Sequence, residues 1–181
     1  MTRCALLVRG VNVGGKKLVM AELRELLTGL GLADVATVLN SGNAVFTTSS
    51  TPAELEPLLE AALAEQLGVR ARCLVRTGAE LRVVRDGHPF PELATNGSRM
   101  MALFTSADPT PQQLAEDDPR LLDPGHVALG ERVVYQWCPD GVLAAPDVSG
   151  LLLKRWGVAV TGRNWNTVEK LVALTSSALT S

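Results

Sequence analysis

Residues 36–47 read Ala-Thr-Val-Leu-Asn-Ser-Gly-Asn-Ala-Val-Phe-Thr, two short apolar runs on either side of Asn40-Ser41-Gly42-Asn43. Asn, Ser and Gly are the residues that tight turns require, and apolar runs flanking such a turn predict a β-hairpin. On both sides of this hairpin the apolar residues recur with the period of amphipathic helices. The hairpin therefore lies at the centre of a larger α/β unit.

Working outward, each predicted helix is joined to one further strand. Apolar spacing predicts a helix over residues 20–30, closed by Gly31, and a short apolar strand precedes it at residues 4–8. Residues 51–54 form a capping box with Pro at the first helical position. The helix that it opens is predicted to bury Leu55, Leu58, Leu59, Ala62, Leu63 and Leu67, and residues 71–75 close the segment as a strand. The order is β-α-β-β-α-β, which is the ferredoxin-like pattern.

Residues 77–80 form a second capping box that opens a short helix, and a loop rich in Pro, Asn and Gly follows at 88–98. The same order then begins again. The predicted elements are a strand at 100–104, a capped helix from 110, strands at 127–129 and 132–137, a helix at 149–156, a strand at 158–161 and a final helix. We therefore predict an α+β protein of two tandem ferredoxin-like units with an additional C-terminal helix. The predicted divisions are 1–76, a helix and linker at 77–98, and 99–181.

Composition excludes several classes of protein. The chain has 181 residues, 46% hydrophobic and 20% charged, which is typical of a globular protein. Its apolar stretches are too short for a membrane-spanning helix, and its N-terminus does not resemble a signal peptide. Three scattered cysteines suit neither a disulfide framework nor a metal cluster. We expect a cytoplasmic protein with no membrane association, metal or cofactor.

Charge and aromatic content argue against a dedicated nucleic-acid binder. The formal net charge is −2, whereas phosphate neutralisation needs a basic surface. Aromatic residues make up only 4% of the chain, and stacking of bases needs aromatic platforms. His88 and His126 have no nucleophile or carboxylate at a recognised catalytic spacing, so the sequence leaves open whether the protein is an enzyme. It also leaves open the oligomeric state.

The topology indicates where a site would form. In a β-α-β-β unit, the loop after the first strand and the hairpin between the second and third strands lie at the same end of the sheet. Residues 10–16 match the G-x-x-x-x-G-K core of a phosphate-binding loop, but Lys17 stands where that motif needs Ser or Thr. A weaker prediction remains, that glycine N–H groups and nearby cations hold an anion. The predicted ligand-binding residues here are Arg9, Gly10, Asn12, Gly14, Gly15, Lys16, Asn40, Ser41, Gly42 and Asn43.

A third polar motif precedes the predicted final helix. In a structural interpretation of this motif, Asn164 or Asn166 is the N-cap of the helix, and the apolar Trp165 side chain packs beneath the start of the helix. Arg163 beside amides at a helix N-terminus is also a favourable place for an anion. We therefore add Arg163, Asn164 and Asn166 to the candidate site, which they join only if the packing of the two halves brings them there.

These motifs together resemble a known family. Residues 5–16, residues 20–23, Ser41-Gly42-Asn43 and residues 163–168 are similar to the bacterial family called domain of unknown function 1697. The resemblance implies a cytoplasmic bacterial protein built of ferredoxin-like units, and it supplies no function. The chain departs from the family pattern at Asn40, where Gln is usual. It also has no lysine between residues 139 and 153, where the family has a basic stretch containing Ser and Lys.

The function that these patterns favour is the binding of a small anionic or nucleotide-like ligand where residues 9–17 and 40–43 meet. Two alternatives stay open. One is a protein–protein interaction module without a ligand, which pairs through exposed strand edges. The other is an enzyme of unassigned reaction that uses the same pocket.

Overall fold

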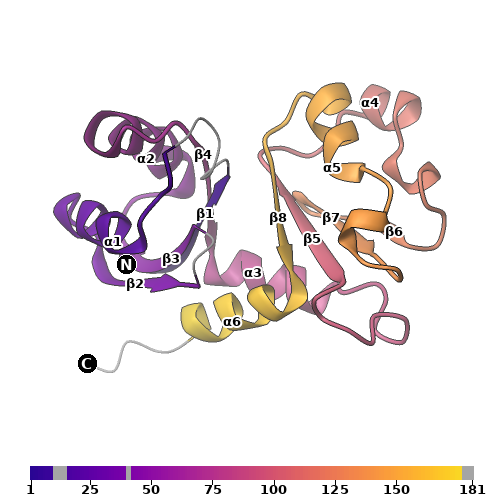
Figure 1. Ribbon diagram of the computed structural model, residues 1–181, viewed down its shortest axis with the longest axis horizontal. Helices are drawn as coiled ribbons and strands as arrows, with labels where there is room; N and C mark the ends of the chain where they lie inside the picture. Colours follow the sequence, from indigo (N-terminus) through magenta and orange to yellow (C-terminus); the bar gives the residue numbers. More distant parts are fainter. Residues whose placement is uncertain (10–15, 40–41, 177–181) are drawn as a thin grey trace. The chain divides into compact units, whose positions relative to one another are not determined.

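The computed structural model describes residues 1–9, 16–39 and 42–176. They form two four-stranded antiparallel sheets with interleaved helices (Figure 1), which confirms the predicted α+β class. By contacts the chain divides into a first unit, Met1–Arg82 with Leu171–Ser181, and a second unit, Val83–Lys170. The boundaries between the two units fall within two helices, α3 (Gly78–Asp86) and α6 (Trp165–Ser176). The divisions at 76 and 98, drawn from motifs, stay a prediction.

The first unit has the predicted β-α-β-β-α-β order. Its elements are β1 (Thr2–Arg9), α1 (Met20–Gly29), β2 (Ala33–Val38), β3 (Asn43–Thr48), α2 (Pro52–Leu67) and β4 (Arg72–Thr77). The strands lie in the order β2-β3-β1-β4, all antiparallel, which is the ferredoxin-like arrangement. Alternate residues of β1, including Leu6 and Val8, pack against Leu23 of α1 and Leu59 of α2 in the core on the helical face.

Local signals set the ends of these helices. Thr51 and Glu54 form the predicted capping box, in which Thr51 N donates to Glu54 Oε2 at 2.7 Å and Glu54 N donates to Thr51 Oγ1 at 3.4 Å. Gly31, at φ +83°, follows the C-cap of α1 as predicted, because the left-handed conformation there favours glycine.

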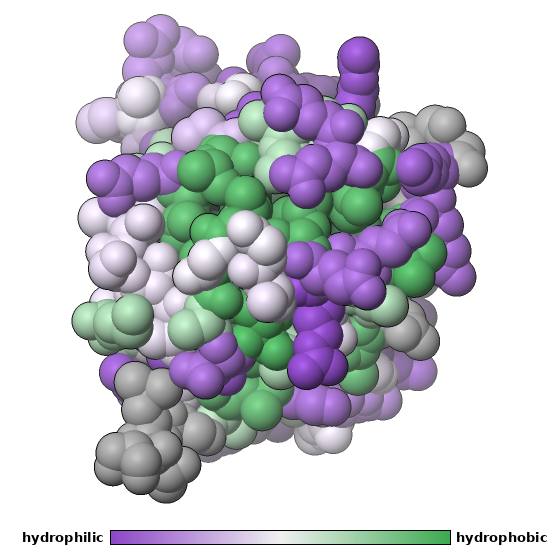
Figure 2. Space-filling model, turned by 90° about the vertical axis from the view of Figure 1, so that its left-hand side faces the viewer, coloured by the Kyte–Doolittle hydropathy of each residue, from purple (hydrophilic) through white to green (hydrophobic). Residues whose placement is uncertain are grey.

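The outer side of α2 is less polar than amphipathic helices usually are. Leu58, which the spacing assigns to the buried face, is 47% exposed, and Ala53, Pro57 and Ala61 are also exposed. The prediction for Leu58 was therefore wrong, because α2 carries apolar residues on more than one of its faces and their spacing does not identify the buried face. Figure 2 views the molecule from the side of α1 and α2 and shows apolar side chains gathered on this face.

The second unit repeats the order with shorter helices. Its elements are β5 (Met100–Thr105), α4 (Pro111–Glu116), η1 (Pro119–Leu121), β6 (Val127–Gly130), β7 (Val133–Trp137), η2 (Val142–Ala144), α5 (Val148–Leu151), the π-helical turn η3 (Leu152–Trp156) and β8 (Val160–Asn164). The strand order is β6-β7-β5-β8. The strand predicted at 158–161 lies two to three residues further along, so Arg163 and Asn164 belong to β8, and α6 begins at Trp165.

The strand pairings show that the units are structural duplicates. Ala5 of β1 lies opposite Val45 and Arg76, whereas Ala102 of β5 lies opposite Tyr135 and Arg163. The central strand of each unit thus places an alanine beside an arginine of the last strand. None of the helices in the described ranges is both long and apolar enough to cross a membrane.

Candidate functional site

The end of β1 and the β2–β3 hairpin lie together in the first unit. Leu7 is the last residue of β1 paired with β3, opposite Asn43, and Val8 N then donates to Gly42 O at 2.9 Å. This bond joins the start of the glycine-rich loop to the hairpin turn. Several of the predicted ligand-binding residues lie outside the described residues. They are Gly10, Asn12, Gly14, Gly15, Asn40 and Ser41.

Basic side chains belong to this end of the first sheet. Arg9 is half-buried and lies directly opposite Arg72, the first residue of β4. Lys16, Lys17 and Arg70 are exposed on the adjoining segments. Among these cations, Arg72 forms an ion pair with Glu60 of α2, with 3.1 Å between Nε and Oε1. An excess of positive charge at one end of the sheet suits an anion.

Lys16 reaches across to the end of α2. A Cβ atom placed on Gly68, the C-cap of α2, would lie 3.4 Å from Nζ of Lys16. An ammonium group there interacts favourably with the negative end of the helix dipole. Lys16 is exposed in this position, so its charge is also available to solvent.

The described residues of the Ser-Gly-Asn motif serve the turn itself. Gly42 has φ +74°, a conformation that favours glycine, and its carbonyl accepts the bond from Val8. Asn43 is completely buried, and its Nδ2 donates to Val38 O at 3.3 Å. The hairpin therefore holds its shape through these two residues.

The motif at 163–166 belongs to the second unit, and each predicted residue has a structural contact there. Arg163 is 9% exposed, and its Nη1 donates to Thr161 Oγ1 at 2.6 Å and to Gly162 O at 2.8 Å. Burial lowers the pKa of Arg163 to about 10. Asn164 Oδ1 accepts from Thr167 N at 3.0 Å, as an N-cap does, and the exposed Asn166 lies against Gly97.

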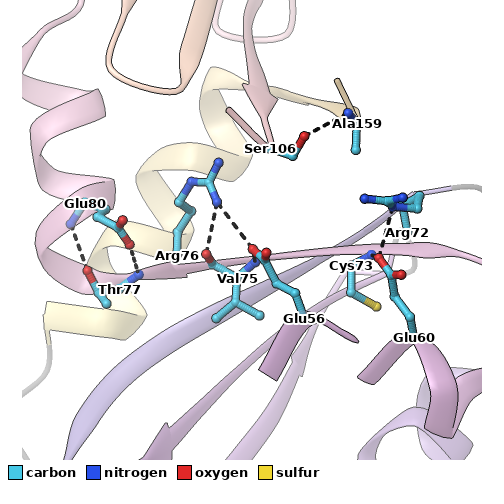
Figure 3. A network of polar contacts seen from close by, with 10 residues as sticks. All are labelled: Glu56, Glu60, Arg72, Cys73, Val75, Arg76, Thr77, Glu80, Ser106 and Ala159. Carbon is cyan, nitrogen blue, oxygen red and sulfur yellow. Dashed lines mark hydrogen bonds and ion pairs between the residues drawn. The ribbon is translucent and has the colours of Figure 1, made fainter. Parts of the chain in front are cut away.

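One buried cation was missed by the sequence analysis. Arg76 of β4 is 2% exposed, donates from Nη1 to Val75 O at 3.1 Å and lies 3.7 Å from Glu56 Oε1 (Figure 3). It corresponds to Arg163 in the other unit. The signal that could have identified it is an arginine one or two residues after the last predicted strand of each unit, Arg76 after 71–75 and Arg163 after 158–161.

The described residues hold neither an exposed cysteine thiol nor a cluster of metal-binding side chains. Cys4, Cys73 and Cys138 are all buried, and burial raises the pKa of Cys4 to about 11 and that of Cys73 to about 12. These thiols therefore stay protonated at neutral pH. Within the described ranges, no group of three or more His, Cys, Asp or Glu side chains is arranged to hold a metal ion.

Comparison with known proteins gives a fold relative and a family. A search of curated proteins returned no match. The chain is similar to a solved structure described as a conserved bacterial protein from Streptococcus pneumoniae, with 27% identity, a TM-score of 0.69, and coverage of 97% of this chain and 99% of that one. The family model described as protein of unknown function (DUF1697) matches residues 1–135, which include the glycine-rich loop and the hairpin. Because this match spans well over half of the sequence, the chain belongs to the DUF1697 family.

Proposed function

We propose that the first unit binds a small anionic ligand, with phosphate or carboxylate groups such as a nucleotide carries, at the end of its sheet where β1 meets the β2–β3 hairpin. The observation that supports this most is the bond from Val8 N to Gly42 O at 2.9 Å. This bond is one residue before Arg9 and holds the end of β1 against the hairpin. It supports a common site for two polar segments that are about thirty residues apart in sequence.

The charge distribution supports an anion as the ligand. Arg9 and Lys16 supply positive charge, and Lys17 and Arg70 add to it from the adjoining segments. By sequence, Gly10, Gly14 and Gly15 contribute backbone N–H groups that approach an anion without a side chain in the way. We assign to the side chains of Asn12, Asn40 and Ser41 the role of orienting the ligand by hydrogen bonds.

The start of α1 adds further donors. Its N-cap is Val19, whose side chain makes no capping hydrogen bond, and Glu22 is the acidic residue of the first turn. The first N–H groups of a helix have no partner within the helix and favour negative charge. Because α1 begins three residues after Lys17, these donors are close in sequence to the cations of this segment.

The alternative of pairing through strand edges is weakened at one edge. β4 is an edge strand, yet its Cys73 N and Val75 N donate to Glu60 and Glu56 of α2, at 2.9 Å each (Figure 3). A partner strand needs such groups free. Helix α2 thus closes this edge, which favours a ligand over β-strand addition there. An enzyme using the same pocket would reveal itself by turnover of the ligand.

The proposal is tested by thermal unfolding of the full chain with pyrophosphate, AMP, a sugar phosphate, citrate and a short RNA. A ligand present at one hundred times its Kd adds about 2.7 kcal/mol to the free energy of unfolding. For a chain of this size that raises Tm by roughly 5–10 °C. We expect the small anions to raise Tm and the RNA to have no effect.

The variants Arg9→Ala and Lys16→Ala locate the site. Losing two charge-assisted contacts of about 1 kcal/mol or more each should weaken pyrophosphate binding at least tenfold in the double variant. Lys154→Ala, which removes one exposed charge from the second unit, is the matched control and should bind normally. Unchanged affinity in the double variant contradicts the proposal. No response to any anion, together with a stable oligomer in light scattering, favours the interaction module.

A further inference from the structure

The second unit has a pocket at the place that corresponds to the proposed site of the first. In β5, Thr105 N donates to Arg132 O at 3.0 Å, and Arg132 has φ +49°, so this bond and turn repeat those of Val8 and Gly42. A pocket of about 300 Å³ opens here between the loop after β5, the β6–β7 hairpin and the end of η3. The residues that matter for its chemistry are Asp108, Pro109, Leu129, Glu131, Val134 and Trp156.

The lining of this pocket combines an apolar floor with negative charge. Trp156 and Val134 are buried at 4% and 2% exposure and form the floor together with the half-buried Leu129. The charged side chains that line the pocket are both carboxylates, Asp108 and Glu131, and both are exposed at its rim. The corresponding end of the first unit is basic, so the two ends differ in the ligand that they suit.

Hydrogen bonds hold the lining in place. Asp108 Oδ1 accepts from Arg132 N at 2.7 Å, which fixes the loop after β5 to the hairpin. Trp156 Nε1 donates to Asp117 O at 3.0 Å, which fixes the indole ring. Arg155, beside Trp156, directs its Nε to Asp117 Oδ1 at 2.9 Å. The pocket is therefore largely formed before a ligand enters, as small-molecule sites usually are.

We propose that this pocket binds a small organic cation, an ammonium or guanidinium group on a short apolar chain. The cation lies between the carboxylates of Asp108 and Glu131, and the chain contacts Leu129, Val134 and the face of Trp156. A volume of about 300 Å³ lies at the lower end of the range of small-molecule pockets and accommodates a chain of a few carbons, and the carboxylates of Asp108 and Glu131 disfavour an anionic ligand such as a nucleotide. The inference does not depend on the function proposed for the first unit.

The test uses the full chain labelled with ¹⁵N and follows the indole N–H signals during titration with pentylamine at neutral pH. Trp156→Phe identifies the Trp156 signal, and Trp137 and Trp165 are internal references because neither lines the pocket. Pentylamine should shift the Trp156 signal saturably, whereas pentanoate, with a chain of the same length and opposite charge, should leave it in place.

Charge-neutralising variants identify the groups that hold the cation. Asp108→Asn with Glu131→Gln should weaken pentylamine binding about three- to tenfold, as expected for two exposed charge pairs. Asn keeps an oxygen that can accept from Arg132 N, so the hairpin should stay folded. Glu92→Gln removes an exposed charge elsewhere in the second unit and should bind normally.

Three outcomes overturn the inference: no saturable shift of Trp156 with pentylamine, an equal shift with pentanoate, or unchanged affinity in the Asp108→Asn/Glu131→Gln variant. The same variant should keep the response of the wild type to pyrophosphate. Failure of this pocket and failure of the proposed anion site are thereby distinguished.

Discussion

Two arginines occupy equivalent buried places in the two units. Arg76 and Arg163 each lie opposite an alanine of the central strand, Ala5 and Ala102. The small alanine side chain leaves room for the arginine beside it. Burial of a guanidinium group is costly unless its N–H groups are bonded, and Arg163 donates to Thr161 Oγ1 and Gly162 O. With a pKa of about 10, Arg163 is still protonated at neutral pH.

We expect His88 to make the stability of the protein depend on pH. Its Nδ1 accepts from Phe90 N at 3.0 Å, which requires the neutral ring, and its ring centroid lies 4.4 Å from that of Trp165. Burial lowers the pKa of His88 below 6.5, while Glu169 opposes that shift. Since the folded pKa is the lower one, the contribution of His88 is complete above pH 6.5 and is lost as the pH falls through the folded pKa.

Urea unfolding between pH 5 and 7.5 measures this effect. The free energy of unfolding of the wild type should fall below about pH 6.5. In His88→Asn, whose amide oxygen can still accept from Phe90 N, this part of the pH dependence should disappear. An equal slope in both proteins would show that His88 does not cause it.

Helix α2 protects the β4 edge of the first sheet. Glu56 and Glu60 lie one helical turn apart and accept from two alternate N–H groups of β4, those of Val75 and Cys73. The distance between residues four apart along a helix thereby matches the distance between residues two apart along a strand. Edge strands are otherwise prone to pairing with other chains. The glutamates therefore give β4 its hydrogen bonds and also limit association.

Replacing both glutamates should expose this edge. In Glu56→Ala/Glu60→Ala, the loss of two hydrogen bonds to charged groups should lower the free energy of unfolding by about 2–4 kcal/mol. Amide exchange at Cys73 and Val75 should accelerate at least tenfold. Glu65→Ala, an exposed change on the same helix, is the control. The role assigned to the pair is wrong if Glu65→Ala has the same effect on these two amides.

The first unit combines segments that are far apart in the sequence, residues 1–82 and the second half of α6. Residues 171–176 of α6 belong to the first unit, where Arg3 Nε donates to Leu174 O at 3.3 Å. Gly78, the first residue of α3, lies so near that a Cβ there would be 2.9 Å from Thr175 O. Only glycine permits this approach between two segments almost one hundred residues apart.

Gly78→Ala tests how much this contact matters. The added methyl group meets backbone that cannot move independently, so the free energy of unfolding should fall by about 1–3 kcal/mol. Gly29→Ala, at the end of α1 with nothing within 4 Å of the new Cβ, should be neutral or gain up to about 1 kcal/mol. Urea unfolding compares the two, and equal stability of both variants would refute the close approach.

Local signals in the sequence determined the order of the elements. The capping boxes at Thr51, Thr77 and Thr110 are present as predicted, because each depends on contacts over three residues. The hairpin at Gly42 and its meeting with the end of β1 also followed from the sequence, since strand order in a β-α-β-β unit sets which loops share an end.

Other features were decided only by the tertiary structure. The exposed position of Leu58, which was assigned to a buried helix face, depends on which neighbours cover the helix. The burial of Arg76 and Arg163 depends on alanines far away in the sequence, and the pocket at Trp156 depends on three separate segments. Pattern and propensity describe contacts within a few residues, whereas burial and cavities arise from segments that meet only when the sheets form.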